Sequence, residues 1–326
     1  MKTNSMKAWW LAARPKTLTA AAVPVLIAIA YGMRDCSLVA LQELSSVGAG
    51  GIRWTAAVLC LLFAWVMQID SNFVNDYFDF KRGNDDDTRL GPKRACAEGW
   101  ITLGAMKVGI GITTLVGCLV GLPLIIYGGC TMVAVGAACV LFCFLYTTTL
   151  SYHGMGDLLV LVFFGIVPVC CTYYVVMPDG HSGSMQEVFL ASVACGMVVD
   201  TLLVVNNYRD RDNDRCAGKR TLILSLIDRC GERSAERFYL LLGYIPLLWM
   251  VASTVSRFTT FGLASCLPLL YLGYLIPHHC ACQQLRLIHH GRELNHVLGT
   301  TARNIFIYGI ITFVVVAGSV LFAEGR

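Results

Sequence analysis

The sequence predicts an all-α polytopic membrane protein with nine transmembrane helices. Of its 326 residues, 56% are hydrophobic and 14% are charged, and the mean hydropathy is +0.63. Soluble domains carry about 25% charged residues, so a soluble globular protein is excluded. Apolar runs that approach the length of a membrane span, about 20 residues, recur nine times. Lysine and arginine gather in alternate connections between these runs, as the positive-inside rule requires.

The first apolar run, 16–33, follows four basic residues and resembles a signal peptide. Further apolar runs come next, and no small-x-small cleavage site leads into a soluble domain, so we interpret it as a retained helix. The remaining spans are expected at 54–78, 103–123, 128–147, 157–177, 187–207, 237–254, 260–277 and 304–323. Only the IIYGG region separates the third span from the fourth. We expect residues 1–326 to form one transmembrane domain.

The basic residues support each span in turn and give an orientation. With the N-terminus in the cytoplasm, four precede the first span, six follow the second, none follow the fourth, eight follow the sixth and three follow the eighth. These are 21 of the 25 lysines and arginines, and the opposite side keeps Arg34, Arg53, Arg257 and Arg326. A missed or additional span would mix the two groups, so the pattern favours nine spans and a cytoplasmic N-terminus.

Two acidic runs end spans on the predicted cytoplasmic side. NDYFDFKRGNDDD (75–87) ends the second span, and NNYRDRDNDRCAGKRTL (206–222) follows the sixth. On a helix, residues three and four apart share a face. One such stripe comprises Gln68, Asn72, Asn75, Asp76 and Asp79, and the other comprises Asp200, Asn206, Asn207, Asp210 and Asp214. The second stripe lies four spans after the first, which suggests two similar four-helix modules and a ninth helix.

These carboxylates stand where a membrane helix disfavours them. Asp70 and Asp200 lie about two turns inside their spans, and a charge at the helix centre costs roughly 2.5–3.5 kcal/mol. The negative end of the helix dipole disfavours carboxylates as well. A cation would relieve both penalties, and sets of oxygen ligands without His or Cys suit Mg²⁺. Two such clusters on facing helices would hold two Mg²⁺ and a diphosphate. For 85–87 alone, a solvated helix end is the competing interpretation.

A basic pair beside a glycine follows each acidic run. The pairs are Lys93 and Arg94 in LGPKRA, and Lys219 and Arg220 in AGKRTL. Gly91 and Gly218 leave the backbone free to approach an anion. The positive-inside rule alone would also place cations here. Their parallel position after an acidic helix end favours a grip on phosphate.

These stretches resemble the paired aspartate motifs of the UbiA superfamily of intramembrane prenyltransferases, and most closely its menaquinone-pathway branch, which acts on 1,4-dihydroxy-2-naphthoate. The similarity extends along the chain through WWLAARPKTLTAAAVPVLIA, SNFVNDYFDFKRGNDDDTRLGPKRA, YHGMGDLLVLVFFG, TYYV, NNYRDRDNDRCAGKRTL and LNHVLGTTARN. The specific parts are RPKT (14–17), GPKRA and GKRTL. One departure is visible: the last aspartate of the first motif falls at Asp85, six residues after Asp79, where many relatives use four and this chain has Gly83.

The resemblance implies a UbiA-like bundle around a central cavity, in the inner membrane of a bacterial cell, with its active-site loops on the cytoplasmic side. It implies transfer of a polyprenyl group from polyprenyl diphosphate to 1,4-dihydroxy-2-naphthoate, with loss of CO2 and diphosphate, to give demethylmenaquinol. The implied cofactor is Mg²⁺, as two ions that bridge the diphosphate. The implied partners are the two substrates and membrane lipid, and no nucleic acid is expected.

The resemblance also assigns roles to residues of this sequence. The expected metal ligands are Asn75, Asp76, Asp79, Asp85, Asn207, Asp210 and Asp214. Contacts to substrate are expected from Arg14, Asn72, Asn75, Asn206, Asn207, Lys93, Arg94, Lys219 and Arg220. Arg14 has the alternative role of orienting the first helix. Asp157 and Tyr146 are candidates for orienting or deprotonating the aromatic acceptor, although Asp157 would equally suit a helix N-terminus.

Three other functions share some of these features. Another acceptor, such as 4-hydroxybenzoate, homogentisate or haem, would fit the same superfamily. CDP-alcohol phosphotransferases also use intramembrane aspartates, but their DGxxAR motif is missing from this sequence. An ion-coupled transporter would line a pathway with polar stripes. It would not require phosphate-binding cations after both acidic runs on one side of the membrane.

Overall fold

The computed structural model describes residues 1–42, 51–83, 89–179, 183–255 and 263–321, which form helices and no strands. The N-terminal half contains α1 (Met6–Ala13), α2 (Pro15–Gln42), α3 (Trp54–Lys81), α4 (Leu103–Gly121), η1 (Leu122–Leu124), α5 (Ile125–Gly128), α6 (Thr131–Thr148) and η2 (Leu150–His153). The C-terminal half contains α7 (Gly156–Leu161), η3 (Val162–Ile166), α8 (Val167–Val176), α9 (Met185–Cys216), α10 (Leu222–Cys230), α11 (Arg233–Val255), η4 (Leu263–Tyr271), α12 (Leu272–Ile288) and α13 (Leu294–Leu321).

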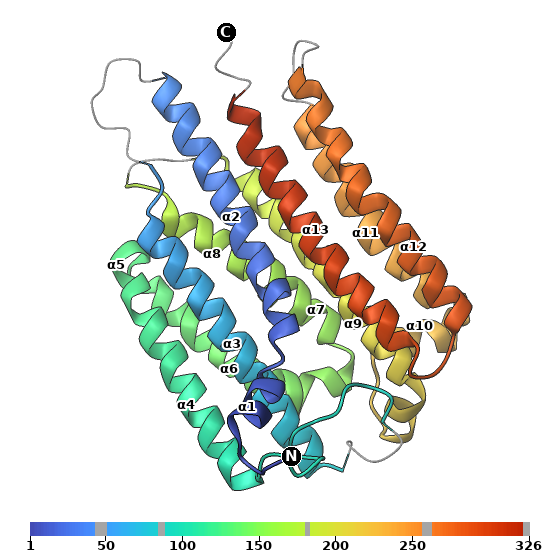
Figure 1. The fold of residues 1–326 in the computed structure, drawn as a ribbon. Helices are drawn as coiled ribbons and strands as arrows, with labels where there is room; N and C mark the ends of the chain where they lie inside the picture. The colour runs from blue at the N-terminus through green and yellow to red at the C-terminus, as the bar shows by residue number, and fades with distance from the viewer. Residues whose placement is uncertain (43–50, 84–88, 180–182, 256–262, 322–326) are drawn as a thin grey trace.

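Eight helical segments of the described chain are long and apolar enough to cross a membrane. They correspond to every predicted span except 260–277, which begins outside the described residues. There the chain forms the 3-10 helix η4 and then α12, which ends at Ile288 rather than at 277. Pro268 and Pro277 remove backbone donors in this segment, which weakens a continuous α-helix. Because α12 has 17 residues, the ninth crossing stays a prediction, although η4 and α12 run beside α11 and α13 (Figure 1).

Several boundaries differ from the sequence-based expectation. A separate helix, α1, precedes the first span and ends at Ala13, and the next residue, Arg14, caps it with a left-handed φ of 50°. Pro15 then begins α2, because its fixed φ suits the first helical position. The predicted span 187–207 continues as α9 to Cys216 and is 32 residues long. The second acidic run therefore stands on the same helix as the span.

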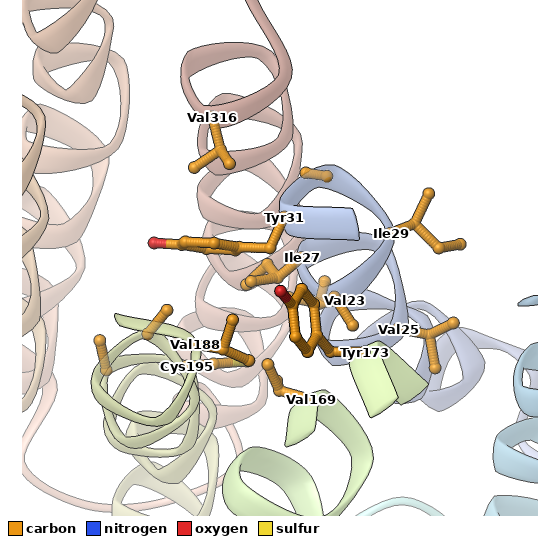
Figure 2. Packing of buried hydrophobic residues seen from close by; sticks show 14 of the residues in the cluster. Val23, Val25, Ile27, Ile29, Tyr31, Val169, Tyr173, Val188, Cys195 and Val316 are labelled. Atoms are coloured by element: carbon orange, nitrogen blue, oxygen red, sulfur yellow. The ribbon is translucent and has the colours of Figure 1, made fainter. Parts of the chain in front are cut away.

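The main apolar core lies among α2, α8, α9 and α13, as Figure 2 shows with Val23, Tyr173, Cys195 and Val316. Close packing in a membrane favours small residues, since lipid supplies no hydrophobic drive for helix association. At one such contact η3 meets α9 backbone to backbone. A Cβ on Gly165 would lie 2.5 Å from the carbonyl oxygen of Ser192 and 2.7 Å from the Cα of Gly196.

The two ends of the bundle differ in chemistry. The N-terminus and the acidic ends of α3 and α9 lie at one end, and α13 finishes at the other (Figure 1). At that other end Arg34 is 3% exposed and binds Asp35 at 2.6 Å and Glu187 at 2.9 Å. The Tyr173 hydroxyl donates to Asp35 at 2.6 Å. These paired charges join α2, α8 and α9 away from the acidic stripes.

Candidate active site

Asp76 fixes the LGPKRA loop against α3. Its carboxylate is buried and accepts hydrogen bonds from the backbone N–H groups of Ala95 at 2.9 Å and Cys96 at 3.2 Å. One helical turn further along, the guanidinium of Arg94 pairs with Asp79 at 2.8 Å. Three residues expected in the site from the sequence, Asp76, Asp79 and Arg94, therefore do meet. Asp76 acts on the loop backbone, and Asp79 faces a cation of the chain.

The two asparagines of this stripe bind neighbouring helices. The Asn72 amide donates to the carbonyl oxygen of Ala13 at 3.0 Å and to the hydroxyl of Thr17 at 3.1 Å. It thereby attaches α3 to the junction of α1 and α2, where Arg14 stands. The hydroxyl of Thr147, at the end of α6, donates to the side-chain oxygen of Asn75. This half of the site is thus braced by three helices.

Arg209 organises the second acidic stripe. Its side chain is fully buried, and it donates to both carboxylate oxygens of Asp210, at 2.8 and 2.6 Å. It also donates to the side-chain oxygens of Asn206 at 2.7 Å and Asn295 at 2.9 Å. From the sequence, Arg209 was expected only as one of the loop cations, and Asn295 was not expected in the site. The sequence does place this arginine between Asn206 and Asp210 on one face of a helix. Because a buried cation needs such partners, the spacing could have indicated that Arg209 is buried in the site.

The LGPKRA loop also reaches α9. The Asn295 amide donates to the carbonyl oxygen of Leu90 at 2.8 Å, so Asn295 joins this loop to Arg209. A Cβ on Gly91 would lie 2.8 Å from a guanidinium nitrogen of Arg209. The glycine expected to approach an anion thus lies against a cation that holds Asp210. One loop therefore contacts both acidic helices.

The four predicted phosphate-gripping cations have different surroundings. Lys219 lies 3.4 Å from Asp214, and Gly218 before it has a φ of 69°, a conformation that glycine adopts without strain. Arg220 is exposed. Arg94 is buried beside Asp79. Lys93 has a side chain that is 69% exposed and pairs with Glu98 at 2.8 Å.

The two stripes converge on Tyr146. This side chain interacts electrostatically with the carboxylates of Asp79 on α3 and of Asp157, Asp200 and Asp214 on the other side of the site. Asp79 and Asp214 are near enough for their charges to repel. Tyr146 and Asp157 line one small cavity together with Asn207 and Lys219. The acidic ends predicted to face each other are therefore brought together.

The donor set fits Mg²⁺ in kind. The ligands offered are carboxylate and amide oxygens, which Mg²⁺ prefers. One oxygen each of Asp157, Asp200 and Asp214 is buried and accepts no hydrogen bond from the described residues, and such oxygens demand a partner. Within the described ranges no three His, Cys, Asp or Glu side chains converge tightly enough to hold an ion. Asp85, the remaining expected ligand, lies outside the described residues, as do Asp86 and Asp87.

Comparison with known proteins decides the family. Residues 37–284 match the family model of the UbiA prenyltransferase family. The chain belongs to this family. Its membership confirms the resemblance found in the motifs and the all-α membrane fold expected from it.

Two relatives of this UbiA family member carry the same name, 1,4-dihydroxy-2-naphthoate octaprenyltransferase. The protein of Haemophilus influenzae is 30% identical over 83% of this chain and 85% of its own length. The protein of Mycobacterium tuberculosis is 30% identical over 98% of this chain and 99% of its own length. A solved UbiA homolog from Archaeoglobus fulgidus, bound to GPP and Mg²⁺, shares the fold with a TM-score of 0.59 at 14% identity, covering 95% of this chain and 99% of that one.

The bridge through Asn295 gives a first testable expectation. Asn295→Ala removes the link between Arg209 and the carbonyl of Leu90, and hydrogen bonds to charged groups contribute about 1.5–3 kcal/mol each. We expect prenyltransferase kcat to fall about tenfold or more, since 1.4 kcal/mol corresponds to a factor of ten. His296→Ala is the matched control because His296 is the next residue and is exposed. Equal kcat in the two variants would show that the bridge has no part in positioning the site.

Proposed function

We propose that this chain transfers a polyprenyl group from polyprenyl diphosphate to 1,4-dihydroxy-2-naphthoate, with release of CO2 and diphosphate, to give demethylmenaquinol. The observation that carries the proposal is the approach of two acidic helix ends across one site, where Asp79 on α3 and Asp214 on α9 are near enough for their charges to repel. Each has a cation of the chain beside it, Arg94 and Lys219. The names of relatives about 30% identical over most of the chain support the acceptor.

Two Mg²⁺ ions would be held by Asp79, Asp210 and Asp214 with Asn75 and Asn207, and would supply charge neutralisation for the leaving diphosphate. The chain itself orients these ligands. Arg209 fixes the Asp210 carboxylate through two hydrogen bonds. Arg94 and Lys219 stand beside the carboxylates and would turn toward the phosphate oxygens, where preorganised cations stabilise developing negative charge.

The acceptor would lie near Tyr146 and Asp157, which line the same small cavity. The unsatisfied oxygen of Asp157 would accept a hydrogen bond from a naphthol hydroxyl and so raise the electron density of the ring. As the allylic C–O bond breaks, its electrons leave with diphosphate, and Tyr146 would stabilise the allyl cation through its ring face. The ring carbon that bears the carboxylate then forms the new C–C bond. The electrons of the broken C–CO2 bond restore aromaticity.

A membrane location suits this chemistry. A polyprenyl tail partitions into lipid with about 0.8 kcal/mol per buried CH2, so the donor substrate arrives from the bilayer. We place the acidic end of the bundle in the cytoplasm of a bacterial cell, at the inner membrane. The support is that basic residues gather in the connections on the side of the N-terminus. In the structure, the N-terminus lies at the same end of the bundle as the acidic stripes (Figure 1).

The assay follows from the proposed reaction. Membranes that contain the chain are incubated with a polyprenyl diphosphate, 1,4-dihydroxy-2-naphthoate and Mg²⁺. We expect a prenylated naphthoquinol and released CO2, detected by mass spectrometry and by label from the carboxyl carbon. EDTA should abolish both products, and added Mg²⁺ should restore them. Parallel reactions with 4-hydroxybenzoate and homogentisate test the alternative acceptors. If product forms only with 4-hydroxybenzoate or only with homogentisate, that compound replaces 1,4-dihydroxy-2-naphthoate as the proposed acceptor. If no acceptor gives a product, the result favours a transporter.

A further inference from the structure

A groove of about 700 Å³ lies on the outside of the bundle, between α3, α4 and α6. Few side chains of α4 and α6 are buried inside the bundle, and α4 stands at an edge of the bundle (Figure 1). Lys81 and Lys107 line the groove together with the apolar side chains of Ile110, Leu115 and Phe144. The proposed reaction uses none of these residues.

The groove has a charged end and an apolar length. Lys81 ends α3 and Lys107 lies in the second turn of α4, so both ammonium groups belong to the acidic end of the bundle. Both lysines are exposed, and the ion pairs found among the described residues do not include them. From Lys107 the lining residues follow one face of α4 to Cys118. From Lys107 to Cys118 the helix rises about 16 Å, at about 1.5 Å per residue. This rise matches the thickness of one leaflet, which is half of a hydrocarbon core about 30 Å thick.

The groove does not belong to the reaction site. At about 100° of rotation per residue, Tyr77, Phe78 and Lys81 lie on the face of α3 opposite to Asp76 and Asp79. Those two carboxylates point toward the LGPKRA loop, as their contacts to Ala95 and Arg94 show. Polyprenyl diphosphate bound for reaction would therefore occupy the other side of α3. The occupant of the groove should instead come from the surrounding bilayer.

We propose that this groove binds one anionic phospholipid from the leaflet at the acidic end of the bundle. The phosphate lies between the ammonium groups of Lys81 and Lys107, and an acyl chain follows Ile110, Leu115 and Phe144 toward Cys118. The charges of the site and of the headgroup are complementary, whereas a zwitterionic headgroup offers no net negative charge. Thr114, which also lines the groove, donates to Asp70 at 2.9 Å and joins α4 to α3. The lipid thus contacts both α4 and α3, the helix that carries the first acidic stripe.

Native mass spectrometry of the purified full chain tests the proposal. The probes are phosphatidylglycerol and phosphatidylcholine with identical acyl chains, added to the protein in detergent. We expect one tightly bound phosphatidylglycerol, preferred over phosphatidylcholine by about 30-fold, since each lysine near an anionic headgroup contributes about a fivefold preference. The double variant Lys81→Gln, Lys107→Gln should lose the preference. Lys7→Gln is the matched control, because Lys7 is exposed on α1 and does not line the groove.

A second variant tests the apolar part without changing charge. Gly111 lines the groove, and a Cβ there would meet nothing within 4 Å, so Gly111→Leu fills the groove without a clash in the protein. It should weaken binding of both lipids about tenfold or more, since a leucine-sized obstruction removes several buried CH2 contacts of the acyl chain. Gly136→Leu is its control, because open space also surrounds that position. Undiminished phosphatidylglycerol binding in both groove variants would overturn the proposal. Displacement of the lipid by a polyprenyl diphosphate would overturn it in favour of a substrate site.

Discussion

Asp210→Asn is expected to lower kcat for prenyl transfer by about 10³-fold while the protein stays folded. In the parent protein the guanidinium of Arg209 donates to both oxygens of Asp210. The variant retains one side-chain oxygen that can accept such a hydrogen bond. It removes one negative charge from the set of ligands proposed for Mg²⁺. Loss of one preorganised electrostatic contact at a reacting centre costs about 10²–10³ in rate, and a metal ligand adds to that cost. The measurement is single-turnover product formation in reconstituted vesicles.

Asp212→Asn is the control for that variant. Asp212 stands on the same helix two residues further on, its side chain is 60% exposed, and it lies 3.5 Å from His290. Its kcat should remain within about twofold of the parent, because exposed ion pairs contribute about 0–1 kcal/mol. Full activity in Asp210→Asn would contradict the assignment of the second acidic stripe to the site.

The helical periodicity of the sequence predicted the two acidic stripes because spacing along one helix needs no tertiary information. Asp76 and Asp79 share a face of α3, and Asp210 and Asp214 share a face of α9, as expected. The predicted span ended at 207, whereas α9 continues to Cys216. Hydropathy ends a span where polar residues begin, whereas a helix continues until its hydrogen bonding is broken, here near Gly218 with its positive φ.

The links between the stripes were not predictable from local pattern. Asn295 meets Arg209 although 86 residues separate them in the sequence, and no spacing rule connects an asparagine on α13 with an arginine on α9. Gly91 was expected beside an anion, and it lies against Arg209 instead. The physical reason is that a buried guanidinium requires acceptors on several sides, and α9 and α13 supply them through Asn206, Asp210 and Asn295.

The ion pairs change how the four expected phosphate-gripping residues are understood. Arg94 faces Asp79 and Lys219 faces Asp214, so carboxylates and cations of the site neutralise one another. Lys93 and Arg220 are exposed and stand at its margin. A buried carboxylate that lacked both a metal and a cation would be costly. The same cations would therefore serve two purposes in turn, to keep the acidic stripes folded and to bind the phosphate oxygens of the substrate.

Asp76→Ala is expected to reduce both activity and stability, because Asp76 acts through the LGPKRA loop. Without its carboxylate the N–H groups of Ala95 and Cys96 lose their acceptor, and each unsatisfied buried donor costs about 1–3 kcal/mol. The loop that carries Arg94 and Gly91 would then lose its backbone hydrogen bonds to α3, and the ion pair of Arg94 with Asp79 would remain. We expect kcat to fall about 10²-fold or more and the thermal unfolding midpoint in detergent to fall with it.

Asp79→Ala separates the loop role of Asp76 from a role in metal binding. Asp79 is partly exposed, and its ion pair among the described residues is with Arg94. Its removal should therefore lower kcat with a smaller change in the unfolding midpoint. Asp76→Asn keeps one oxygen that can accept from the loop, and it should recover most of the midpoint lost in Asp76→Ala. If Asp76→Ala kept the parent midpoint and still lost activity, Asp76 would act on the metal or the substrate directly. Recovery of both the midpoint and kcat in Asp76→Asn would assign its role to the loop, because an amide oxygen replaces a hydrogen-bond acceptor far better than it replaces a charged metal ligand.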